Sequence, residues 1–146
     1  MVWIELHGWS ILLPGDIHRQ QEQQLLLQYP NLQADLLVLP HHGSNTSSSL
    51  AFLQQLQVRV ALNSAGRHRG FQHPHALVQA RLELLQIPLW NTADQGAIQI
   101  ALTPDFVQIY SNRASRLPFW LDSMQAKRSQ RVRIVEKEQQ DDQFAD

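Results

Sequence analysis

The chain contains no cysteine, and this absence excludes both disulfide bonds and thiolate metal ligands. It has no apolar run near the roughly 20 residues that span a bilayer, and no basic segment followed by an apolar one at its N-terminus. The sequence therefore predicts neither a membrane span nor an export signal. The formal net charge of -1 provides no overall attraction to nucleic acid, so any contact with DNA requires a local basic patch.

The composition is that of a folded protein. Of the 146 residues, 43% are hydrophobic and 17% are charged, which is enough apolar material for one domain with a buried core. The N-terminus enters a strand-like apolar segment at Val2 without a polar lead, which favours a chain that begins inside a larger fold. From Asp122 onward most residues are polar, so we predict a domain over residues 1–121 and a mobile polar tail over residues 122–146.

Strand-like and helix-like segments alternate along the predicted domain. The predicted strands are residues 2–7, 9–13, 35–39, 58–62, 88–91, 97–102 and 106–111. The predicted helices are residues 18–28, a segment through Leu56 with its N-cap among residues 44–47, and a segment that opens at Pro74 and buries Leu77, Leu82 and Leu85. This order predicts an α/β fold with α+β layers, whose functional loops lie at the strand ends.

Four candidate metal ligands fall in those loops, namely Asp16, His41, His42 and His73. A carboxylate and imidazoles suit zinc or manganese, and loops at one edge of a sheet bring such ligands together. Asp16 has the simpler interpretation of a turn residue in Pro-Gly-Asp, and His73 also fits a helix cap. The adjacent histidines favour a functional role, because two imidazoles directly after a buried strand are uncommon without chemistry.

A basic loop follows the fourth predicted strand. Arg67, His68 and Arg69 place two guanidinium groups near the candidate site, and Ser44 adds a hydroxyl group. These residues are candidates for contact with phosphate, although an ordinary exposed basic loop has the same composition. No role is assigned to three further histidines, which are expected to be structural or exposed, namely His7, His18 and His75.

Several of these blocks resemble ComEC-type DNA-uptake proteins. The matching residues, from Trp3 to Tyr110, are Leu-Leu-Pro-Gly-Asp at 12–16, Asp-Leu-Leu-Val-Leu-Pro-His-His-Gly-Ser at 35–44, Asn-Ser-Ala-Gly at 63–66, His-Pro at 73–74 and Gly-Ala-Ile at 96–98. They are similar to the C-terminal half of that family's metallo-β-lactamase-like domain. The resemblance implies half of an αββα metallo-β-lactamase-like fold.

The resemblance also implies roles for the candidate residues. Asp16 would bridge two metals, one histidine of the pair His41 and His42 would be a ligand, and His73 would approach the substrate phosphate as a second catalytic group. Two departures stand out: His18 occupies a position that is often acidic in the family, and residues 67–71 replace a loop that usually carries Asn and Tyr.

One family motif is absent. No His-x-His-x-Asp-His spacing occurs in this sequence, so most metal ligands are missing and the chain alone is expected to be inactive or nearly so. The complete domain is expected to hold zinc or manganese, which this chain alone need not bind.

The resemblance implies a metal-dependent phosphodiesterase or nuclease that acts on single-stranded DNA during natural transformation. The domain would lie on the extracytoplasmic side of the bacterial inner membrane, joined to the remainder of a membrane-embedded DNA channel protein. Two alternatives stay open: a module in which Arg67, Arg69 and Trp90 or Phe71 hold single-stranded DNA without cleavage, and a hydrolase of the same fold that acts on another ester. The half-fold is also expected to self-associate through an uncovered sheet edge.

Overall fold

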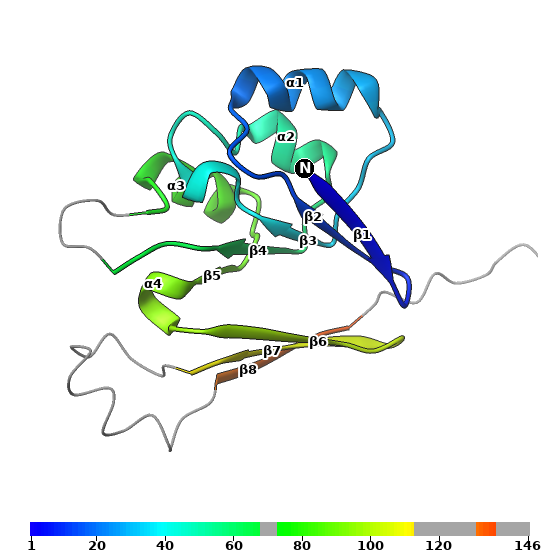
Figure 1. The fold of residues 1–146 in the computed structure, drawn as a ribbon, viewed down its shortest axis with the longest axis vertical. Coiled ribbons are helices and arrows are strands. Elements are labelled where there is room, and N and C mark those ends of the chain that lie inside the picture. Colours follow the sequence, from blue (N-terminus) through cyan, green and yellow to red (C-terminus); the bar gives the residue numbers. More distant parts are fainter. Residues whose placement is uncertain (68–72, 113–130, 137–146) are drawn as a thin grey trace, which may run out of the picture.

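A computed structural model describes residues 1–67, 73–112 and 131–136, which form two sheets and a layer of helices (Figure 1). The first sheet has five strands, in the order β1 (Val2–Leu6), β2 (Trp9–Leu13), β3 (Leu36–Val38), β4 (Val60–Asn63) and β5 (Leu89–Asn91). The second sheet has three, in the order β6 (Ile98–Leu102), β7 (Phe106–Ser111) and β8 (Arg131–Glu136). The helical elements are α1 (Arg19–Gln28), the short 3-10 helix η1 (Pro40–Gly43), α2 (Leu50–Gln55), α3 (Ala76–Leu84) and α4 (Thr92–Gln95).

The strand directions create one edge where several loops meet. β1 and β2 form an antiparallel hairpin, whereas β2, β3, β4 and β5 run parallel to one another. Helices connect the parallel strands, so every loop that leaves one of these strands emerges on the same side. We call that side the carboxyl edge, and the opposite side, where the parallel strands begin, the amino edge.

The strand side chains alternate between two cores. Leu12, Leu37 and Ala61 point toward the helices and pack in a cluster with Phe52 and Val78. The neighbouring positions point the other way and form a second cluster with the second sheet, namely Trp9, Leu36, Val60, Leu62, Trp90, Val107 and Ile109. The first sheet is therefore the middle layer, with α1, α2 and α3 on one face and the second sheet on the other (Figure 1).

The predicted α/β class is confirmed, and each predicted strand is present with ends shifted by at most two residues. The helix boundaries need correction. α2 takes its N-cap from Ser49, whose Oγ accepts a hydrogen bond from Phe52 N at 3.3 Å, and not from residues 44–47. The hydroxyl groups nearer the strand are already engaged, since Ser47 Oγ donates to the Pro40 carbonyl at 2.8 Å.

The third helix also differs from its prediction. α3 begins at Ala76, two residues after Pro74, and its N-cap is His75, whose Nδ1 accepts from Leu77 N at 3.2 Å. Leu77 is 54% exposed and Val78 is fully buried, so the buried stripe includes Val78 and Leu82. The predicted turn over residues 93–96 is largely occupied by α4.

Part of the predicted tail belongs to the fold. Within residues 122–146, Arg131–Glu136 forms β8 and pairs antiparallel with β7. This pairing places residues 131–136 in the second sheet, an element that the predicted polar tail over residues 122–146 did not include. In the part of the chain that the structure describes, no helix has the length and apolar character needed to span a membrane.

Candidate functional site

The loops after β2 and β3 meet at the carboxyl edge. His41 N donates a hydrogen bond to the Gly15 carbonyl at 3.1 Å, and this bond joins the Pro-Gly-Asp turn to the histidine pair. Asp16, the next residue, has an exposed side chain. The structure thus brings together the two segments that carry Asp16, His41 and His42.

The histidine pair has an uncommon backbone conformation. His41 has φ 49° and ψ 43°, His42 has φ 54° and ψ 26°, and Gly43 continues the run with φ 73°. A left-handed conformation costs a residue with a Cβ about 1–2 kcal/mol, so two successive histidines hold strain that the surrounding contacts must offset. Strain of this kind gathers at functional sites.

Gly43 lets a third loop approach the pair. A Cβ built on Gly43 would lie 2.5 Å from Pro74 Cβ and 2.9 Å from Pro74 Cα, so no other residue fits there without movement. His75 N donates to the Gly43 carbonyl at 2.9 Å on the same side. His73, which precedes Pro74, is therefore held next to the loop of the histidine pair.

His42 is the more suitable ligand of the pair. Its Nδ1 lies 2.7 Å from the Ser64 carbonyl oxygen, and since a carbonyl only accepts, Nδ1 carries the proton. In the neutral ring Nε2 then keeps its lone pair on an exposed side chain, the arrangement common in metal-ligating histidines. His41 Nδ1, by contrast, is buried and has no hydrogen bond from the described residues.

His18, which was assigned no role, is in contact with the site. Its ring lies edge-on to that of His41 with 4.7 Å between ring centroids and 89° between planes. Its Nδ1 lies 3.0 Å from Thr46 Oγ1, and Thr46 Oγ1 lies 3.1 Å from Ser44 Oγ. The sequence signals were its position two residues after Asp16 and its place where the resembled family is often acidic; the contact to His41 could not be predicted, because it spans more than twenty residues.

Two buried asparagines support the third loop. Asn91 Nδ2 donates to the His73 carbonyl at 2.9 Å, and Asn63 Nδ2 donates to Asn91 Oδ1 at 3.2 Å. Asn63 and Asn91 end β4 and β5, and they are only 1% and 7% exposed. The ends of both strands thereby position His73. Sequence analysis assigned a role to neither asparagine, although Asn63 begins the block 63–66 that resembles the family.

The predicted phosphate contacts are only partly described. Ser44 lies in the loop after the histidine pair, and Arg67 is exposed in the loop after β4. His68, Arg69 and Phe71 lie outside the described residues. Trp90, predicted as a stacking residue for single-stranded DNA, is 6% exposed and packs between the sheets, so that prediction is wrong.

The ligand set of the described residues does not complete a catalytic metal site. Within residues 1–67, 73–112 and 131–136, no three His, Asp or Glu side chains lie close enough together to hold a metal ion. A catalytic zinc uses three protein ligands and a water. Asp16 and the histidine pair supply at most part of such a site.

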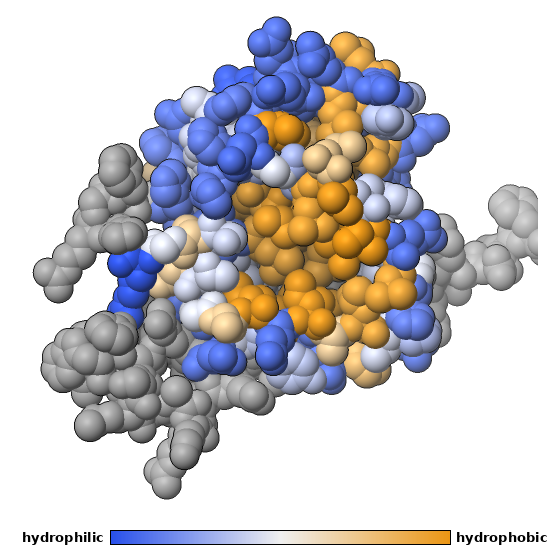
Figure 2. All heavy atoms as spheres, viewed as in Figure 1, coloured by the Kyte–Doolittle hydropathy of each residue, from blue (hydrophilic) through white to orange (hydrophobic). Residues whose placement is uncertain are grey.

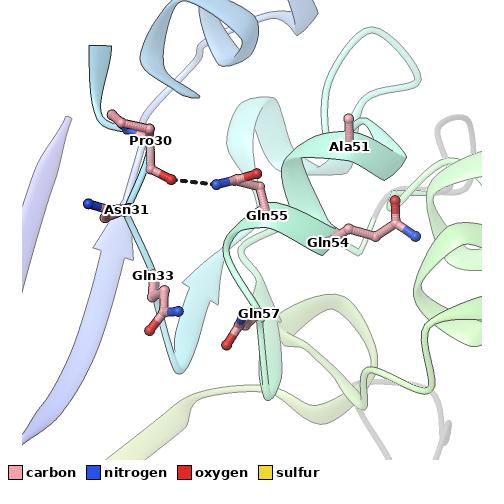
Figure 3. A pocket seen from close by; sticks show the side chains of 7 residues that line it. All are labelled: Pro30, Asn31, Gln33, Ala51, Gln54, Gln55 and Gln57. Atoms are coloured by element: carbon pink, nitrogen blue, oxygen red, sulfur yellow. Dashed lines mark hydrogen bonds between the residues drawn. The ribbon is translucent and has the colours of Figure 1, made fainter. Parts of the chain in front are cut away.

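A groove at the amino edge is lined by uncharged side chains, unlike the candidate site (Figure 3). It encloses about 730 Å³ and is lined by Pro30, Asn31, Gln33, Ala51, Gln54, Gln55 and Gln57. Gln55 Nε2 donates to the Pro30 carbonyl at 2.5 Å across its upper end. The lining residues carry no ionisable group and include no predicted site residue, so the candidate site remains at the carboxyl edge.

Comparisons with known proteins identify relatives of this chain. No family model matches it. It is 38% identical over 99 residues to the ComE operon protein 3 of Bacillus subtilis, which covers 68% of this chain and 13% of that protein. It is 41% identical over 112 residues to the uncharacterized protein YcaI of Escherichia coli, and this match covers 76% of this chain and 15% of that protein. It is 40% identical over 96 residues to the competence protein ComA of Neisseria gonorrhoeae, and this match covers 65% of this chain and 14% of that protein.

These relatives are much longer than the region they share with this chain, which spans only 13–15% of their length. Three independent matches at 38–41% identity extend over about two thirds of this chain or more. The chain therefore belongs to the ComEC-type family of competence proteins.

Proposed function

We propose that this chain supplies one part of a metal-dependent phosphodiesterase that acts on DNA during its uptake by a ComEC-type protein. The observation that carries the proposal is the meeting of three loops at the carboxyl edge, where Asp16, the histidine pair and His73 belong to segments joined by hydrogen bonds. The names of two relatives, a competence protein of Neisseria gonorrhoeae and recombination protein 2 of Haemophilus influenzae, support DNA as the substrate.

Each residue has a defined part in this proposal. The exposed Asp16 carboxylate and His42 Nε2 are the metal ligands, and Ser44 and Arg67 contact the phosphodiester. His73, held by Asn91, faces the substrate as a catalytic group with Asp16. The metal is zinc or manganese, and its remaining ligands come from outside the described residues, because these residues alone do not complete the site.

The proposed partner is the remainder of a longer membrane-embedded DNA channel protein. This chain corresponds to only 13–15% of its relatives, so most of each relative is available to complete the site. In this proposal the chain lies on the extracytoplasmic side of the inner membrane and meets single-stranded DNA there. The alternative of a non-catalytic DNA-binding module loses Trp90, which is buried and cannot stack on a base, and would depend on Phe71, which lies outside the described residues.

The first test places this chain in the Neisseria gonorrhoeae competence protein in place of the 96-residue segment that it matches. We expect His42→Asn and Asp16→Asn to lower both transformation frequency and the release of nucleotides from labelled DNA by about 100-fold, the upper end of the effect that even outer-shell changes have at metal sites. Asparagine tolerates the left-handed backbone of His42, so the loop is retained.

A matched control is available at the other end of the sheet. His7 has φ 53°, is exposed and lies in the turn between β1 and β2, so His7→Asn makes the same substitution in the same backbone conformation. It should leave both readouts unchanged. Equal nucleotide release by the His7 and His42 variants would contradict the proposed phosphodiesterase, even if transformation fell in both.

A further inference from the structure

The carbonyl group that orients His42 lies in an exposed loop. It belongs to Ser64, and Ser64, Gly66 and Arg67 of the loop after β4 are all exposed. Figure 2 shows mostly polar and near-neutral residues on the side of the molecule where Figure 1 places α4, whereas the apolar residues gather in the middle of the view. Water therefore competes for the hydrogen bonds of this loop, and the Ser64 carbonyl needs support from the fold to keep its direction.

Thr92 provides that support where the sheet ends. The parallel pairing of β4 and β5 stops at Asn63 and Asn91, and the chain of β5 then turns into α4. Directly after this point, Thr92 Oγ1 accepts a hydrogen bond from Ala65 N at 2.9 Å and donates one to the Ala65 carbonyl at 2.9 Å. A single half-buried hydroxyl group thus bonds both backbone groups of Ala65, which lie beyond the last pair of the two strands.

The bond to Ala65 N also fixes the Ser64 carbonyl. The Ser64 carbonyl and the Ala65 N–H belong to the same peptide group, which is planar, and in a trans peptide they point in opposite directions. Thr92 Oγ1 lies on the N–H side of this plane, and Nδ1 of His42 lies 2.7 Å from the carbonyl oxygen on the other side. The peptide plane therefore joins the Thr92 hydroxyl group to the imidazole ring of His42.

We propose that Thr92 is a positioning residue that sets the tautomer of His42 through this peptide plane. The Ser64 carbonyl, held in place by Thr92, keeps the proton of the neutral ring on Nδ1, so that Nε2 keeps its lone pair. The role rests on the proposed function, in which Nε2 is a metal ligand, whereas the tautomer is a property of this chain alone. Groups that orient a metal ligand typically change metal affinity or activity by roughly 10–100-fold.

Loss of the Thr92 hydroxyl group should release the peptide plane. The plane is then able to turn in its exposed loop, and Nδ1 of His42 loses the acceptor that holds its proton. The neutral ring is then able to carry the proton on Nε2, where it occupies the lone pair that a metal requires. The expected change is local to His42, because the fold around α4 is retained by the hydrogen bonds of Asn91.

Three substitutions at Thr92 separate the hydroxyl group from the rest of the side chain. Thr92→Val keeps the shape without the hydroxyl group, Thr92→Ser keeps the hydroxyl group, and Thr92→Cys keeps a weak donor and acceptor. Thr103 supplies a matched control in the turn between β6 and β7. Its Oγ1 donates to the Phe106 carbonyl at 2.8 Å and accepts from Phe106 N at 3.1 Å, so Thr103→Val removes the same pair of bonds away from the site.

Nitrogen NMR of the histidine rings measures the tautomer, because a ring nitrogen that carries a proton and one that keeps its lone pair differ in ¹⁵N shift. The spectra are recorded without added metal, at a pH that keeps the ring neutral, and His42 is assigned by the signals that His42→Asn removes. The unaltered chain should carry the proton on Nδ1. Thr92→Val should shift both ring nitrogens toward the other tautomer, and Thr92→Cys should do so by a smaller amount. Thr92→Ser and Thr103→Val should leave the ring unchanged.

Unchanged ring nitrogens in folded Thr92→Val would overturn the proposal, and so would an equal change in Thr103→Val. If Thr92→Val does not fold, the difference between Thr92→Cys and Thr92→Ser decides. In the Neisseria gonorrhoeae hybrid protein, Thr92→Val should lower nucleotide release by about 10-fold, and Thr92→Ser should retain it. Nucleotide release that His42→Asn fails to lower would contradict the proposed function alone, because the ring spectra test the positioning without it.

Discussion

The two edges of the five-stranded sheet use left-handed backbone differently. At the amino edge such residues are isolated or sit in a two-residue turn: His7 precedes Gly8, and Gln57 and Gln86 follow the ends of α2 and α3. At the carboxyl edge three left-handed residues follow one another, from His41 to Gly43.

The surroundings of these residues explain the difference. Gln86 completes a helix end in which Ile87 N donates to the Leu82 carbonyl at 2.8 Å, a local arrangement found in many helices. The run from His41 to Gly43 is held by contacts with Gly15 and Pro74, which are distant in sequence. Turns and helix ends thus explain the left-handed residues at the amino edge. At the carboxyl edge, long-range contacts hold an uncommon backbone conformation, as they do at functional sites.

The largest expected effect tests the close approach at Gly43. Gly43→Ala places a Cβ 2.5 Å from Pro74 Cβ in a left-handed conformation, and overpacking plus strain should lower the free energy of unfolding by about 2–5 kcal/mol. Gly15→Ala is the control, because its Cβ meets no atom within 4 Å and only the backbone cost remains. Urea denaturation of both variants measures the difference, and equal losses would mean that the approach of Pro74 is not restrictive.

A smaller effect tests the support behind the histidine loop. The fully buried Glu22 carboxylate of α1 accepts hydrogen bonds from Ser48 N at 2.5 Å and Ser49 N at 3.0 Å, just before α2. Glu22→Gln weakens these bonds and should lower the free energy of unfolding by about 1.5–3 kcal/mol, the range for hydrogen bonds to charged groups. The exposed Glu83 supplies the control, since Glu83→Gln should change stability by no more than about 0.5 kcal/mol.

The smallest effect has the opposite sign and belongs to the amino edge. Gln86 has φ 56° at the position after α3 where glycine is preferred. Gln86→Gly removes left-handed strain but adds freedom to the unfolded chain, so stability should rise by only about 0.5 kcal/mol. Thermal unfolding checks the sign, and a clear loss of stability would show that the Gln86 side chain makes a contact worth more than the strain.

Much of the fold followed from local patterns. The hairpin was predicted from two β-rich runs around Gly8, and the parallel strands from apolar runs bounded by turn residues. The N-terminus of α2 was not predicted correctly, because several polar residues precede Leu50 and each is a suitable N-cap. Ser49 is the cap because Ser47 is bonded to Pro40 and Glu22 holds the backbone of residues 48 and 49. β8 was missed because its pairing partner, β7, lies about twenty residues earlier and outside any local window.

By itself, the sequence determined which elements form and, through their alternation, that Asp16, His41 and His42 follow strands that end at one edge. The preferences that form helices and strands act over a few residues, so they can be predicted from the sequence alone. Only the tertiary structure decided that the Ser64 carbonyl holds Nδ1 of the exposed His42 while Nδ1 of His41 is buried, that His18 lies against His41, and that Trp90 is buried. The reason is physical: each of these outcomes depends on contacts between residues far apart in the sequence, and such contacts exist only once the sheets and helices have packed.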